Sequence, residues 1–367
     1  MTLILISIFT AVMAIFTLTP ICKVEAWYIR GFDFPRVQFS LLISLLLVAQ
    51  CIFLDLSSPI VWGLILVALS CLGYQLWWIA PYTPLFPVEV ERAKRSGGLT
   101  KPYDTVSILT ANVLTPNKNA KGLVDLIKRH QPDIFVTLES DNWWQSQLDV
   151  LELDYPHTMK CPLDNLYGMH VYARFPLSKS QIQFLVEDDV PSMHTLIHTP
   201  SGHTINAHFL HPAPPSPTEN ETSEERDAEL LVVAKKVSKT DVPTIVAGDL
   251  NDVAWSYSTR LFRKISGLLD PRVGRGMYNT YHASYWFMRW PLDHLFHSHH
   301  FRLLKIERLP GFGSDHFALL TQLQLEAEAK PVQNTVSLEE GDEAIAQEKI
   351  DQQNVEVSDV ASFNNSK

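Results

Sequence analysis

The stretch Thr244-Ile245-Val246-Ala247-Gly248-Asp249-Leu250-Asn251 combines a short apolar run with a glycine and two polar side chains. This short run, with the β-branched residues Thr244, Ile245 and Val246, predicts a buried β-strand at 244–247. Asp249 and Asn251 follow directly, where such a strand ends. An isolated Asp after a strand is usually a turn residue. Polar residues at strand ends therefore indicate a functional site only if several strands of the domain carry them.

Strand and helix signals alternate on both sides of this stretch. The sequence predicts strands at 106–109, 134–136, 204–210 and 244–247, and helices at 122–130 and 224–237. Alternating elements predict an α/β or α+β domain, which we place at residues 103–325.

Polar residues with catalytic potential recur at the ends of the apolar runs in this domain. They are Asn112, Glu139, His211, Asp249, Asn251, Asp293, Asp315 and His316. Strand ends of a layered α/β fold converge on one rim, so these side chains are expected to share a pocket.

The chemistry of this set suits phosphoester hydrolysis. Carboxylates such as Glu139 are the ligands that Mg²⁺ or Mn²⁺ prefers. If Asp315 and His316 begin a strand, they point to opposite faces, so the carboxylate that orients His316 must come from elsewhere. Asp293 is the leading candidate.

The first 81 residues form a predicted membrane anchor. Uncharged apolar stretches at about 3–22, 37–54 and 59–80 each approach the ~20 residues that a helix needs to cross a bilayer. Three such stretches favour membrane spans over buried helices or a signal peptide. If only two form, the following domain lies on the opposite side.

Basic residues predict the orientation of the anchor. Lys23, Arg30 and Arg36 lie between the first two spans, and Arg92, Lys94, Arg95 and Lys101 follow the third. The positive-inside rule places this side in the cytoplasm, together with residues 103–325.

Two further segments flank the domain. Residues 82–102 are rich in proline and contain Ser96-Gly97-Gly98, which predicts a linker. Residues 326–367 hold ten acidic and three basic residues, a net −7 of the chain's −10, and are expected to be a disordered acidic tail. The first 325 residues carry only −3, which gives no support for a strong duplex-DNA groove.

The motifs together resemble the endonuclease/exonuclease/phosphatase superfamily, whose deoxyribonuclease-I-like members hydrolyse phosphoesters. The matching pieces, in order, are Leu109-Thr110-Ala111-Asn112-Val113, Asp133-Ile134-Phe135-Val136-Thr137-Leu138-Glu139, Ala173-Arg174-Phe175-Pro176, Leu210-His211-Pro212-Ala213-Pro214-Pro215, Ala247-Gly248-Asp249-Leu250-Asn251, Pro291-Leu292-Asp293-His294 and Gly313-Ser314-Asp315-His316. The sequence looks most like the bacterial branch with N-terminal membrane helices.

This resemblance implies a four-layer α/β sandwich, with two packed sheets and helices outside. By position it makes Glu139 the principal metal ligand, supported by Asn112 and Asp315, for Mg²⁺ or Mn²⁺. Asp249 would position or activate the attacking water, and Asn251 would contact the phosphate.

His316, oriented by Asp293, and His211 would flank the phosphate. Arg174 lies in a segment that the family uses near the rim of the site. His208 could fill the position of His211, but His211 stands at the strand end before the proline-rich loop. Trp255, four residues after Asn251, is a further candidate substrate contact.

These features predict a membrane-anchored, metal-dependent hydrolase of phosphomonoesters or phosphodiesters in the bacterial inner membrane. Nucleic acid, nucleotide, phospholipid head group and inositol phosphate all stay open as substrates, and the oligomeric state is not predicted. The rival interpretation is a catalytically silent membrane-tethered scaffold or binding module with the same fold.

Overall fold

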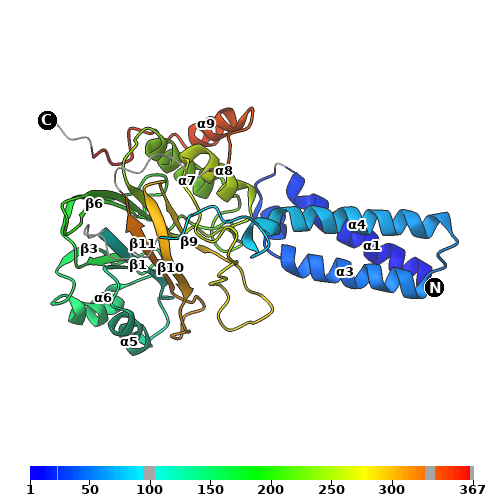
Figure 1. The fold of residues 1–367 in the computed structure, drawn as a ribbon, viewed down its shortest axis with the longest axis horizontal. Coiled ribbons are helices and arrows are strands. Elements are labelled where there is room, and N and C mark those ends of the chain that lie inside the picture. Colours follow the sequence, from blue (N-terminus) through cyan, green and yellow to red (C-terminus); the bar gives the residue numbers. More distant parts are fainter. Residues whose placement is uncertain (23, 94–103, 327–334, 364–367) are drawn as a thin grey trace.

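A computed structural model of the chain describes residues 1–22, 24–93, 104–326 and 335–363. Three long helices extend from one side of a layered α/β body (Figure 1). The expected Ser96-Gly97-Gly98 linker centre and the basic residues Lys23, Lys94, Arg95 and Lys101 lie outside the described residues.

The three helices are α1 (Thr2–Leu18), α3 (Arg36–Phe53) and α4 (Pro59–Ile79), with the short α2 (Trp27–Arg30) between the first two. Each is long and apolar enough to cross a membrane, over Thr2–Ile21, Arg36–Phe53 and Pro59–Tyr82. Most of their apolar side chains face outward rather than into the protein. This confirms the expected three N-terminal apolar helices.

Buried polar side chains hold the three helices together. Gln50 donates from Nε2 to Oγ1 of Thr10 (3.0 Å), and Gln75 donates from Nε2 to Oγ1 of Thr17 (3.1 Å). Such bonds supply specific association where apolar contacts alone do not favour one partner over lipid.

Two sheets form the centre of the body. One has the strand order β10 (Phe301–Arg308), β11 (Leu319–Leu325), β1 (Asp104–Asn112), β2 (Ile134–Leu138), β4 (Met169–Ala173), β3 (His157–Cys161). The other has the order β5 (Leu177–Gln183), β6 (Ser192–His198), β7 (Thr204–Leu210), β8 (Thr244–Asp249), β9 (Asp293–His297).

Successive side chains along each strand point to opposite faces of its sheet, so one hydrophobic core lies between the sheets and two more lie between the sheets and the outer helices. Ile108 of β1 and Ile245 of β8 belong to the core between the sheets, whereas Leu109 and Val246 face the outer helices. The outer helices are α5 (Ala120–His130) and α6 (Asn142–Leu148) on one sheet, and α7 (Glu224–Ser238) and α8 (Tyr257–Ser266) on the other. The predicted four-layer sandwich is therefore confirmed.

The C-terminal segment corrects the expectation of a disordered tail at 326–367 over its described part, whereas 327–334 and 364–367 lie outside the described residues. Within residues 335–363 the chain forms α9 (Asp342–Gln352), and Ala346 and Ile350 are buried against α7 and α8. Val355 and Val360 continue this buried surface. The acidic composition masks an apolar pair at i and i+4, and most of the stability of such a helix comes from packing that pair against α7 and α8.

The start of the expected linker 82–102 is also packed. The Tyr82 hydroxyl donates to the Ala254 carbonyl (2.6 Å), and Arg263 donates to both carboxylate oxygens of Glu89 (2.6 Å each). Residues 82–93 are therefore part of the body rather than a free tether.

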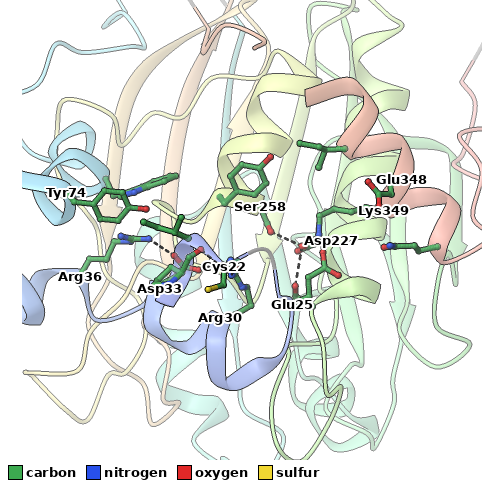
Figure 2. Close-up of a pocket in the computed structure, with 17 residues that line it drawn as sticks. Cys22, Glu25, Arg30, Asp33, Arg36, Tyr74, Asp227, Ser258, Glu348 and Lys349 are labelled. Atoms are coloured by element: carbon green, nitrogen blue, oxygen red, sulfur yellow. Dashed lines mark hydrogen bonds and ion pairs between the residues drawn. The ribbon is translucent and has the colours of Figure 1, made fainter. Parts of the chain in front are cut away.

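The anchor and the body meet at a polar junction that encloses a cavity of about 380 Å³ (Figure 2). On one side Asp33 forms an ion pair with Arg36 (2.5 Å). On the other, Lys349 of α9 forms ion pairs with Asp227 of α7 (2.9 Å) and with Glu25 of the connection between α1 and α3. The C-terminal helix thus joins the anchor to the body.

Candidate active site

One rim of the sandwich collects the strand ends that carry the predicted polar residues. β1 and β2 run parallel, so Asn112 and Glu139 leave them at the same edge. β7 and β8 are parallel in the second sheet, which brings His211 to the same edge as Asp249. Asp293 begins β9 directly opposite Asp249 in the antiparallel register.

The backbone turns sharply where two of these strands stop. Glu139 (φ 57°) and Asn251 (φ 51°) both adopt the left-handed conformation, which is uncommon for residues other than glycine. Gly248 (φ 151°) is required by close packing, because a Cβ there would lie 1.9 Å from the Leu210 carbonyl oxygen. Such local strain is typical of functional sites.

Asn112 links the two central carboxylates. Its Nδ2 donates to Oε1 of Glu139 (2.6 Å) and to Oδ2 of Asp249 (3.2 Å). The other Glu139 oxygen, Oε2, is buried and lacks a hydrogen-bond partner among the described residues. Burial, reinforced by the charges of Asp315 and Asp249, raises the pKa of Glu139 to about 7. A buried carboxylate with one unsatisfied oxygen is a fitting ligand for a cation.

His316 lies between two carboxylates. Its Nδ1 is 2.8 Å from Oδ2 of Asp293, and its Nε2 is 3.5 Å from Oδ2 of Asp249. Burial opposes protonation, but these two carboxylates outweigh it and raise the pKa of His316 to about 10. Asp249, Asp293 and His316 also place one ligand-type atom each within 4.8 Å of one another, but a metal ion could bind all three only if His316 lost its proton.

The pKa of His211 is shifted in the opposite direction. Its ring is buried beside the Tyr167 ring, and the two ring centroids are 5.3 Å apart. Burial lowers the pKa of His211 to about 4. At neutral pH these shifts favour a neutral His211 and a protonated His316 beside the same pocket, an arrangement that separates acid and base roles.

The pocket that these residues share has a volume of about 310 Å³. Its lining includes Glu139, His211, Asn251, Asp315 and His316. Asn251 also donates from Nδ2 to the Pro212 carbonyl (3.1 Å), which holds the proline-rich loop against the rim.

Asp315 and His316 do not begin a strand, because β11 starts at Leu319. They lie in the preceding loop, where His316 forms an isolated bridge with Tyr281. Asp293 is nevertheless the carboxylate on His316 Nδ1.

His208 lies outside this pocket. It is buried in β7, and its Nδ1 is 2.8 Å from Nδ1 of His194. The structure therefore places His211, and not His208, beside Asp249 and His316.

Two candidate substrate contacts lie away from the pocket. Arg174 follows β4 at the end that pairs with Ile134, the first residue of β2, whereas Glu139 follows the last residue of β2. The two residues therefore lie at opposite edges of the sheet. The Arg174 guanidinium stacks on the Tyr155 ring (4.9 Å). Trp255 is 1% exposed and donates from Nε1 to the Asp33 carbonyl (2.9 Å). It supports the anchor junction and has no free face for a substrate.

Sequence reasoning missed Tyr281 and Arg226. The Tyr281 ring lies 4.9 Å from the His316 ring and lines the pocket. Arg226 of α7 donates from Nη1 to the Asn251 carbonyl (3.0 Å) and so fixes the backbone at that residue. Neither follows a strand, so the strand-end pattern could not mark them.

The chain belongs to the Endonuclease/Exonuclease/phosphatase family, whose profile matches residues 109–316, more than half of the sequence. A family protein from Bacteroides thetaiotaomicron is similar in structure, with 16% identity, a TM-score of 0.50, and coverage of 63% of this chain and 98% of that one. Another from Bacteroides vulgatus has 16% identity and a TM-score of 0.50, covering 61% and 100%. No curated protein is a significant match to this sequence.

Proposed function

We propose that this protein is a membrane-anchored, divalent-metal-dependent hydrolase of phosphoester bonds. The observation that supports it best is the meeting of Glu139, Asn112 and Asp249 with the Asp293–His316 pair at one rim and beside one pocket. Family membership supports the same reaction class.

The donor set fits Mg²⁺ or Mn²⁺. Glu139 would hold the ion through its unsatisfied Oε2, with Asn112 and Asp315 in support. When bound, the ion supplies positive charge that offsets the charge of the phosphate during the reaction.

The other residues of the site have separate roles in hydrolysis. Asp249 accepts a proton from the attacking water, whose oxygen forms the new bond to phosphorus as the ester P–O bond breaks. Asn251 and the neutral His211 contact the phosphate oxygens. His316, protonated and held by Asp293, stabilises negative charge and can give a proton to the leaving oxygen.

We further propose that α1, α3 and α4 cross the bacterial inner membrane and that the catalytic body lies in the cytoplasm. The apolar helices support this orientation, as do Arg30 and Arg36 beside the body-side end of α3 and Arg92, which follows α4 in the sequence.

The test is hydrolysis of bis-p-nitrophenyl phosphate and p-nitrophenyl phosphate by the full chain in lipid nanodiscs, with Mg²⁺, Mn²⁺ or excess chelator. We expect metal-dependent turnover that is reduced by about 10²-fold or more in each of Glu139→Gln, Asp249→Asn and His316→Ala. Glu152→Gln, an exposed carboxylate outside the pocket, is the matched control.

Folded protein that neither binds Mg²⁺ or Mn²⁺ nor hydrolyses either ester would contradict the proposal and favour the silent scaffold. The diester-to-monoester ratio would separate nuclease-like from phosphatase-like specificity.

A further inference from the structure

The loop before β9 carries a run of exposed apolar side chains. Tyr285, Trp286, Phe287 and Met288 are 50%, 80%, 53% and 41% exposed. Single exposed apolar residues are ordinary, but four in succession make a patch that marks an interaction surface.

This loop lies beside the membrane anchor. Gln38, in the first turn of α3, donates from Nε2 to the Phe287 carbonyl (2.9 Å). The backbone of the loop is therefore level with the body-side end of an apolar helix, and Figure 1 shows the yellow loop next to that end. At the body-side end of α4, Trp77 is also exposed, as expected of an aromatic belt at a membrane surface.

The same loop leads into the candidate active site. Tyr281 and Leu292, on its two arms, line the pocket, and so does Phe34 from the connection between α1 and α3. The rings of Phe34 and Trp290 are in edge-to-face contact (5.7 Å between centroids). The pocket is thus bordered by the anchor and by the loop that lies against it.

We propose that residues 285–288 insert into the head-group layer of the bilayer and that the substrate is a phosphoester in the head group of a membrane phospholipid. The occupant is a bilayer because the patch continues the surface of helices that could span one. This inference rests on the proposed hydrolase function. In the reaction, water adds to phosphorus, the P–O bond to one alcohol breaks, and that alcohol leaves with a proton.

The position of the loop can be measured without activity. The full chain is placed in nanodiscs of phosphatidylethanolamine and phosphatidylglycerol whose acyl chains are brominated near the head group, or are not. We expect bromine to quench more tryptophan fluorescence in the wild type than in Trp286→Phe. Equal quenching of the two proteins would overturn the membrane contact.

Activity tests the substrate. Trp286→Ser combined with Phe287→Ser should lower release of head-group products from these lipids by about tenfold or more. Hydrolysis of bis-p-nitrophenyl phosphate should stay unchanged. Leu153→Ser, which replaces a 97% exposed apolar residue following α6, is the matched control and should change neither rate.

Equal loss with both substrates, or turnover of soluble nucleotide diesters but not of lipid, would overturn the lipid substrate. Quenching of Trp286 without turnover of any phosphoester would support the position of the loop and would contradict the proposed hydrolase, so the two failures are distinguishable.

Discussion

The contact between Asp293 and His316 makes a prediction at the scale of single residues. Asp293→Asn removes one of the two carboxylates that raise the pKa of His316, so this pKa should fall. We expect kcat/KM to drop by about 10²-fold. NMR titration of labelled histidine would follow the His316 ring, and Asp241→Asn, which changes an exposed carboxylate, is the control. An unchanged histidine titration would contradict the role given to Asp293.

The raised pKa of Glu139 leads to a prediction of how the affinity for metal ions depends on pH. Its pKa is raised to about 7, so below that pH the metal-free protein holds a proton that a metal ion must displace. Affinity for Mg²⁺ or Mn²⁺ should therefore weaken as pH falls below about 7, by up to about tenfold per unit. Calorimetry at pH 6 and pH 8 would measure this change. In Glu139→Gln the affinity should be low and its dependence on pH should be reduced.

At the scale of elements, α9 should stabilise the body rather than act as a loose tail. Ile350 is buried against α7 and α8, and its replacement by Ala should lower the free energy of unfolding by about 2 to 5 kcal/mol. Ala344→Ser, at an exposed position of the same helix, should have little effect. Denaturant unfolding of the full chain would compare them, and similar values would mean that α9 contributes no packing.

The elements also explain how far the sequence could predict the structure. The positions of Asn112, Glu139 and Asp249 can be predicted because each polar residue stands at the end of a short apolar run. The strand order then brings these strand ends to one rim of the sandwich. Trp255 was misjudged because sequence distance from Asn251 does not reveal the direction of a side chain.

The C-terminal helix was missed for a different reason. Its own composition is acidic and weakly apolar, so its order depends on surfaces of α7 and α8 that are remote in sequence. Tyr281 was also beyond prediction, because it reaches the pocket from a loop that no periodicity describes.

At the scale of the whole molecule, the orientation of the anchor can be tested. We expect the body to lie on the cytoplasmic side, because Arg30 and Arg36 lie beside the body-side end of α3 and further basic residues follow α4 in the sequence. Protease added to intact spheroplasts should leave residues 104–363 uncut, whereas protease added to inverted membrane vesicles should cleave them. Cleavage in spheroplasts would place the body outside.

The junction of anchor and body also sets how the protein can find its substrate. Trp255 holds the Asp33 backbone, and Lys349 holds Glu25, so the connection between α1 and α3 is fixed to the body at two separate points. If the helices cross a bilayer as proposed, the pocket keeps a constant height above it. Encounters would then follow lateral diffusion in two dimensions, and turnover would scale with the mole fraction of substrate at the surface rather than with its bulk concentration.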